Sequence, residues 1–126
     1  MEKMISETVF EILRQDGVVA IATNGKDGVH IVNTWNKYIN FNQAGHWLVP
    51  AGRMQKTEKN VTAEPKVLFT IGSSNVKGLH GLGCGFLIEG TAVFLKEGPD
   101  YEFMKSKFPW LRAVLSVTVK SAIQTL

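Results

Sequence analysis

Three short polar side chains interrupt a segment whose other residues suit a β-strand: Asn33, Thr34 and Asn36. Asparagine is depleted in strands because its side-chain amide competes for backbone hydrogen bonds. One interpretation is a solvent-facing stretch or a bulge. The other is that the amides and the hydroxyl face a polar ligand, with Trp35 and Tyr38 offering flat apolar surface beside it. The segment is therefore a candidate binding element.

The second candidate segment runs from Pro50 to Thr57 and joins the end of a predicted strand to the start of a predicted helix. The small residues Ala51 and Gly52 would let a ligand approach the backbone closely. Free N–H groups at a helix start attract phosphate, and Lys56 and Thr57 would add a positive charge and a hydroxyl. The alternative is an ordinary solvated helix that follows a glycine turn.

Basic residues outnumber acidic ones around this segment. Between Gly52 and Lys77 stand five basic residues (Arg53, Lys56, Lys59, Lys66 and Lys77) and two acidic ones (Glu58 and Glu64). A bound phosphate ester carries about −1.5 to −2 charges near neutral pH, so the excess has the right sign and size for one phosphate. Over the whole chain, 14 Lys and Arg against 11 Asp and Glu leave a net charge of +3. This charge suits a small anionic ligand and is too weak to indicate nucleic acid.

The glycine-rich residues 78–85 are a weaker candidate, because they lack the Lys-Ser/Thr ending of a P-loop. We interpret them as part of a flexible loop. The single cysteine, Cys84, excludes an intrachain disulfide and a thiolate zinc cluster, and we interpret it as a packing residue. His30, His46 and His80 are isolated from one another in the sequence, so no metal site is predicted.

Length and composition are those of one globular domain over residues 1–126. The 13.9 kDa chain has 44% hydrophobic and 20% charged residues, which excludes a disordered or collagen-like chain. The longest apolar run, residues 18–22, is far shorter than the roughly 20 residues that a membrane-spanning helix needs. The N-terminus also lacks the pattern of a signal peptide. We therefore expect a cytoplasmic protein with no membrane partner.

The pattern of apolar residues predicts six strands and three short helices, which favours a small antiparallel barrel with helices over its ends. The first helix, residues 7–16, would turn toward the core an apolar face that begins at Ile5. The strand over residues 18–23 is a continuous apolar run and should be buried on both faces. Pro50 should end the third strand, because proline cannot donate to a ladder. The predicted strands are 18–23, 29–39, 46–49, 66–73, 86–95 and 112–123, the other helices are 54–63 and 99–107, and residues 74–85 are a predicted loop.

Several of these segments resemble one protein family, in the same order along nearly the whole chain. They are residues 33–38 (NTWNKY), 49–61 (VPAGRMQKTEKNV), 85–88 (GFLI), the region of Trp110 and residues 121–126 (SAIQTL). The chain is similar to the small FMN-binding proteins of the FMN-binding split-barrel family, which is related to pyridoxamine-phosphate oxidase. An ordered match of this length is more specific than any single motif.

The resemblance implies a six-stranded antiparallel split barrel, a homodimer and one non-covalently bound FMN in each subunit. It places Asn33, Thr34 and Trp35 at the ribityl phosphate and ring region of FMN. It places Lys56 and Thr57 at the phosphate. The other residues implied at the flavin are Val49, Pro50, Ala51 and Gly52 along the edge of the isoalloxazine ring, Tyr38 nearby, and Trp110 and Leu126 contributed by the partner subunit.

The resemblance also implies a function. FMN performs the redox chemistry of such proteins, while the protein orients and tunes it. We therefore expect an FMN-binding flavoprotein, either an electron-transfer protein or a small oxidoreductase, that exchanges electrons with a redox protein or a small molecule. An electron carrier is favoured over a defined enzyme, because the sequence assigns no catalytic residue.

Three alternatives stay open. The first is a pyridoxamine-phosphate-oxidase-like enzyme, although residues 124–126 lack the arginine-containing substrate segment of those enzymes. The second is a barrel that stacks nucleic-acid bases on Trp35, Tyr38 and Trp110. Acidic residues dilute the basic groove that it would need, so nucleic acid is not the expected partner. The third is a barrel without a cofactor, because Arg53 stands where the family has a second glycine.

Overall fold

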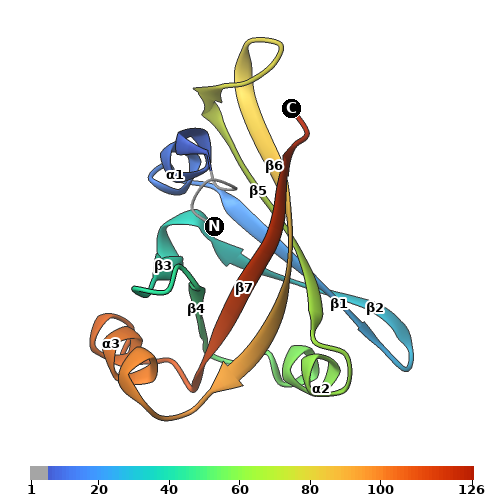
Figure 1. The fold of residues 1–126 in the computed structure, drawn as a ribbon, viewed down its shortest axis with the longest axis vertical. Coiled ribbons are helices and arrows are strands. Elements are labelled where there is room, and N and C mark those ends of the chain that lie inside the picture. The colour runs from blue at the N-terminus through green and yellow to red at the C-terminus, as the bar shows by residue number, and fades with distance from the viewer. Residues whose placement is uncertain (1–5) are drawn as a thin grey trace.

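The computed structural model describes residues 6–126, so the predicted start of the first apolar face, Ile5, lies outside the described residues. Figure 1 shows a strongly twisted antiparallel sheet with short helices around it. The sheet has seven strands in the order β2-β1-β5-β6-β7-β4-β3. The elements are α1 (Glu7–Leu13), β1 (Val18–Gly25), β2 (Gly28–Trp35), the 3-10 helix η2 (Asn36–Tyr38), β3 (Asn40–Phe41), β4 (Trp47–Ala51), α2 (Gln55–Ala63), β5 (Lys66–Lys77), β6 (Leu82–Leu95), α3 (Pro99–Lys107) and β7 (Ala113–Gln124).

The predicted mainly β, antiparallel fold with short flanking helices is confirmed, but the strands number seven where six were predicted. The difference arises because the predicted strand 29–39 stops at Trp35. The next residue, Asn36, is fully buried, and its Nδ2 donates to the carbonyl oxygens of Ile12, Gln15 and Gly72 at 3.2, 3.2 and 3.0 Å. These bonds hold the chain in the turn of η2, after which it continues as the two-residue strand β3.

The prediction that β1 is buried on both faces is wrong. Val19, Ile21 and Thr23 point into the core, whereas Ala20 and Ala22 are only half-buried. Alanine is apolar but small, so it adds to an apolar run without revealing that one face of the strand is accessible.

The prediction that Pro50 ends the third strand is also wrong, because β4 runs on to Ala51 and pairs Pro50 with Val114 of β7. The other neighbour of β4, β3, pairs only with Trp47 and Leu48. Beyond Leu48, therefore, β4 has an unpaired edge, where a residue without an N–H group is tolerated.

Most of the predicted loop 74–85 is strand. β5 continues to Lys77 and β6 starts at Leu82, so only a short turn joins them, and Figure 1 shows this hairpin extending beyond the rest of the sheet. Val76 and Cys84 lie on its inner face and are each 2% exposed in the core. Cys84 is thus the packing residue that its sequence context predicts.

The core lies between the inner face of the sheet and α1, which buries Val9, Ile12 and Leu13 but ends three residues earlier than predicted. Its largest side chain, Trp47, is 1% exposed and packs edge-on against Phe69. A second, smaller cluster lies under α3 and contains Leu48, Met104, Leu111 and Val114. Full burial of each such side chain contributes roughly 1.5–3 kcal/mol. This cluster anchors the chain on either side of Trp110.

The first testable prediction concerns Asn36. Asn36→Ala should lower the free energy of unfolding by about 2–3 kcal/mol, because buried backbone carbonyls lose their donor. Urea denaturation followed by circular dichroism measures this change. Asn75→Ala, at an exposed position of β5, is the control and should change the value by no more than about 0.5 kcal/mol. Equal effects of the two substitutions would contradict the structural role given to Asn36.

Candidate functional site

A groove of about 280 Å³ lies at the seam between β2, one edge strand of the sheet, and the end of β4, which lies next to the other edge. All four residues of the segment 32–35 line it. Because successive side chains of a strand point to opposite faces, a groove lined by consecutive residues runs along the edge of the strand. The full lining is Val32, Asn33, Thr34, Trp35, Tyr38, Pro50, Gly52, Arg53, Met54 and Trp110.

The groove brings together three regions of the sequence: β2 with the adjoining η2, the end of β4 with the turn before α2, and the turn after α3. Most of its lining was predicted from the sequence. The predicted residues that it contains are Asn33, Thr34, Trp35, Tyr38, Pro50, Gly52 and Trp110. Trp110 differs from the expectation in one respect: the prediction has it contributed by the partner subunit, whereas it lines the groove of its own chain beside Tyr38.

Five predicted residues do not line the groove. Val49 and Ala51 are fully buried within β4, opposite residues of β7, and so support the groove from behind. Lys56 and Thr57 are in the first turn of α2, the helix that starts directly after the groove residue Met54. Leu126 lies beside the β5–β6 hairpin.

One wall of the groove is aromatic. The ring centroids of Tyr38 and Trp110 are 5.7 Å apart, and each of these rings also packs against Phe108, at 5.2 and 5.7 Å. Gly52 permits this arrangement, since a Cβ atom there would lie 3.2 Å from the indole ring of Trp110. Trp110 nevertheless remains half-exposed, so it can contact a ligand.

At the other side of the groove, α2 begins in an unusual way. Met54 is the N-cap residue and has φ +63°, the only positive φ of a non-glycine residue in 6–126. Within the same described range, no side chain caps this helix start, and the first backbone bond of the helix comes from Glu58 N to the Met54 carbonyl oxygen. The N–H groups of residues 55–57 therefore remain available as donors, at the positive end of the helix dipole.

Two side chains of this helix turn have the chemistry of an anion site. Lys56 is half-exposed and makes an exposed ion pair with Asp27, with 3.4 Å between Nζ and Oδ2. Thr57 is fully buried, and its hydroxyl has no hydrogen-bond partner in the part of the chain that the structure describes. A buried hydroxyl without a partner is costly, so this atom is suited to a ligand or a water molecule that completes the site.

Sequence reasoning did not assign three lining residues: Val32, Arg53 and Met54. Val32 resembles any apolar strand residue. Arg53 was noted only as a departure from the family pattern, and Met54 was interpreted as the first residue of a helix. Their common signal is position: Val32 and Arg53 are next in the chain to the assigned residues Asn33 and Gly52, and Met54 lies between the assigned residues Gly52 and Lys56.

The groove lining has no thiol, imidazole or carboxylate, and Tyr38 and Arg53 are the titratable side chains that the described residues contribute to it. Elsewhere in residues 6–126, no three or more His, Cys, Asp and Glu side chains gather in a way that could hold a metal ion. No helix in this range has the length and apolar character needed to cross a membrane.

Comparison with known proteins places the chain in a family. Residues 5–124 match the model of the family described as pyridoxamine 5'-phosphate oxidase. The chain is also 50% identical over 123 residues to the FMN-binding protein of Nitratidesulfovibrio vulgaris (strain DSM 19637 / Miyazaki F), covering 98% of this chain and 100% of that protein. This chain therefore belongs to the pyridoxamine 5'-phosphate oxidase family.

Solved structures show the same fold at low sequence identity. An FMN-binding protein from Syntrophomonas wolfei superposes with a TM-score of 0.77 at 14% identity, covering 100% of this chain and 89% of that chain. HupZ from Group A Streptococcus superposes with a TM-score of 0.78 at 17% identity, covering 96% and 94% of the two chains. The split-barrel architecture is thus shared with proteins of very different sequence.

The buried hydroxyl of Thr57 leads to the second prediction. In the ligand-free protein, Thr57→Val should raise the free energy of unfolding by about 1 kcal/mol, because a polar group without a partner is replaced by a methyl group of similar size. Thermal and urea unfolding measure the change. The matched control is Thr62→Val on the same helix, where the exposed hydroxyl donates to the Glu58 carbonyl oxygen. A loss of stability in Thr57→Val would mean that the hydroxyl already has a partner.

Proposed function

We propose that this protein is a flavoprotein that binds one FMN non-covalently in the groove and uses it to transfer electrons. The observation that carries the proposal is the chemical division of the groove, with an aromatic wall on one side and an uncapped helix start on the other. FMN has the same division, a flat ring system and an anionic phosphate. The 50% identity to a protein named FMN-binding protein supports the same ligand here.

The phosphate would be held at the first turn of α2. The free N–H groups there attract an anion, Lys56 adds a full positive charge, and the Thr57 hydroxyl adds a donor. The ion pair of Lys56 with Asp27 is no obstacle. Both side chains are largely exposed, and such pairs are worth only about 0–1 kcal/mol, so a dianionic phosphate can take the place of the aspartate.

The ring would lie toward Trp35, Tyr38 and Trp110, with the polar groups of Asn33 and Thr34 on the β2 side. When bound, FMN supplies the redox chemistry of the site. The aromatic side chains exclude water from one side of the ring and disfavour additional negative charge, whereas the guanidinium of Arg53 favours it. The balance of these two groups would set how readily the flavin accepts electrons.

The absence of a thiol, an imidazole and a carboxylate from the described lining supports a role in electron transfer over acid–base catalysis of a substrate reaction. The electron donor and acceptor are then a redox protein or a small molecule. If the purified protein instead oxidises pyridoxamine phosphate and releases peroxide, it is an oxidase and the electron-transfer proposal fails.

We also propose that the protein acts as a homodimer, with the outer face of the sheet as its interface. The exposed side chains Ile31 of β2 and Ile123 of β7 are 62% and 58% exposed. Ala22 pairs with Ile31 and with Leu68 on one side of this face, and Leu87 pairs with Ile123 on the other. Thr70, opposite Leu87, and Glu89, opposite Leu68, lie between the two apolar groups. Large apolar side chains exposed on two strands of one sheet face are typical of an interface.

This face continues directly into the groove. Asn33 and Trp35 follow Ile31 at every second position of β2, so all three side chains point to the same side of the strand. The groove of one copy is also near the lower end of the roughly 300–1,000 Å³ range of small-molecule sites. A second copy on this face would therefore cover ligand surface that one copy leaves open.

The position of Leu126 agrees with this arrangement. β7 runs from Ala113, opposite Ala51 near the groove, to Gln124 next to the chain end. At about 3.3 Å per residue, this strand has a contour of roughly 36 Å. Leu126 is thus distant from the groove of its own chain, and its predicted place beside a flavin requires a second copy.

The third prediction tests the phosphate end. Lys56→Ala should weaken FMN binding about 10- to 100-fold, because a charge-assisted contact to the phosphate is lost. Binding of riboflavin, which lacks the phosphate, should change little. Quenching of flavin fluorescence on titration measures both. Lys59→Ala, an exposed lysine on the same helix, is the matched control. Equal FMN affinity in Lys56→Ala and the wild type would refute the assignment.

The fourth prediction tests the interface. The wild type should elute as a dimer in size-exclusion chromatography with light scattering, and Ile31→Lys should shift it to a monomer with weaker FMN binding, because a charge is placed in an apolar contact. Phe103→Lys, at an exposed position of α3 away from this face, should remain a dimer. A monomeric wild type with tightly bound FMN would overturn the proposed interface.

A further inference from the structure

We infer that Arg112 is a positioning residue for the phosphate end of the groove, where its guanidinium ties the Arg53–Met54 turn to Glu58 in the first turns of α2. The inference rests on the proposed function, since that function defines which end of the groove receives a phosphate. It concerns a residue that lies outside the groove lining and acts through the backbone of a lining residue.

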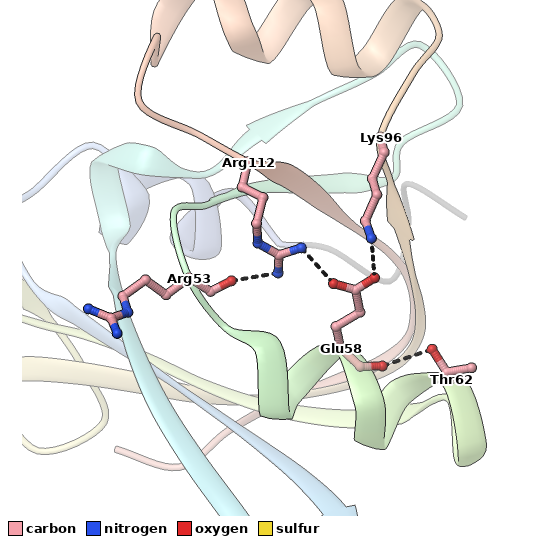
Figure 2. Close-up of polar contacts among 5 residues, drawn as sticks. All are labelled: Arg53, Glu58, Thr62, Lys96 and Arg112. Atoms are coloured by element: carbon pink, nitrogen blue, oxygen red, sulfur yellow. Dashed lines mark hydrogen bonds and ion pairs between the residues drawn. The ribbon is translucent and has the colours of Figure 1, made fainter.

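Figure 2 shows the geometry. Arg112 donates from Nη2 to the carbonyl oxygen of Arg53 at 2.7 Å and from Nη1 to Oε1 of Glu58 at 2.8 Å. The second carboxylate oxygen of Glu58, Oε2, lies 2.8 Å from Nζ of Lys96. The planar guanidinium has several donors in fixed directions, so one side chain can bridge a carbonyl and a carboxylate. A lysine ammonium on a flexible stem does not reproduce this bridge.

The turn needs such an external tie. Met54 follows Arg53 directly and occupies the left-handed region, which costs a residue with a Cβ atom conformational energy. The Met54 carbonyl oxygen accepts the first bond of α2, from Glu58 N at 2.9 Å. Arg112 therefore holds the turn on both sides of Met54: at the preceding carbonyl directly, and at the start of the helix through the side chain of Glu58.

The same contacts control the charge next to the phosphate. Glu58 is an acid in the first part of α2, where an unpaired carboxylate would repel a dianion. Hydrogen bonds from Lys96 and from Arg112 hold the pKa of Glu58 below its ordinary value, so it stays ionised and paired. With one negative and two positive side chains, the cluster keeps a net charge of +1 and does not oppose phosphate binding.

The aromatic wall is held by other contacts. The turn that carries Trp110 is fixed by the backbone bond from Arg112 N to the Ala51 carbonyl oxygen at 2.8 Å and by Lys105 Nζ, which donates to the Leu111 carbonyl oxygen at 2.7 Å. Neither contact uses the Arg112 side chain. Replacing that side chain should therefore disturb the phosphate end of the groove and leave the ring end in place.

The experiment compares FMN with riboflavin on the wild type, on Arg112→Lys and on the control Arg14→Lys. Arg14 is exposed at the end of α1, so the control makes the same exchange far from the α2 turn. Dissociation constants come from flavin fluorescence titration. Arg112→Lys should weaken FMN binding about tenfold or more and riboflavin binding by no more than about threefold, whereas Arg14→Lys should change neither. A general loss of stability would weaken both ligands alike.

The outcomes separate this inference from the proposed function. An unchanged ratio of the two constants in a folded Arg112→Lys overturns the positioning role alone. A wild type that does not prefer FMN over riboflavin overturns the phosphate site and, with it, the inference. If circular dichroism shows that Arg112→Lys does not fold, Arg112→Gln replaces it. Glutamine is shorter than arginine, so its amide does not reach Arg53 and Glu58 together, and the same fall in the ratio is expected.

Discussion

The buried amide of Asn36 is the contact on which the shape of the groove depends. Its three hydrogen bonds join the end of α1 to β5 and hold the turn of η2. Because of this turn, β2 ends at Trp35, and Tyr38 packs against Phe108 and Trp110. The chain then reaches the opposite edge of the sheet as β3. The seam between the two edges, and thus the groove, follows from one asparagine that has no place in a regular strand.

The two ends of the groove are supported in different ways. The aromatic end is backed by buried parts of β4 and by the small core under α3. The other end consists of an uncapped helix start, a strained turn and exposed charged side chains. A packed aromatic surface at one end and a positively charged turn at the other suit a ligand that has a planar ring and a phosphate.

Much of this arrangement could be predicted from the sequence, and the errors have specific physical causes. Alternating and continuous apolar runs indicate strands wherever tertiary contacts agree with them, as in β6 and β7. The sequence could not show that Asn36 bonds to α1 and β5, since the partners are carbonyl groups of distant segments. Likewise, the glycines of residues 78–85 suggested a loop, although glycine pairs also fit closely spaced strands, as Gly72 and Gly85 do.

For the site, too, some residues could be predicted from the sequence and others could not. Residues with distinctive side chains, such as Trp35 and Trp110, could be singled out because their types and the family pattern stand out, but the sequence could not show that Trp110 lines the same groove as Trp35 of its own chain. Val49 and Ala51 were not separable from Pro50 and Gly52, since only the pairing of β4 with β7 decides which of them faces the groove. Arg112 had no signal in the sequence at all. Its role depends on the carbonyl direction of Arg53, which follows from the left-handed conformation of the next residue.

The sulfur atoms of the described residues differ in how open they are to oxidants. Burial raises the pKa of the Cys84 thiol, and Met104 is completely enclosed, so neither sulfur is open to oxidants. Met54 differs, because it lines the groove and is only half-buried. Of the three sulfur atoms in residues 6–126, the Met54 thioether is thus the one that an oxidant entering the groove would meet. Its sulfoxide would place a polar group in the turn that begins α2, so oxidation there would act on the site itself.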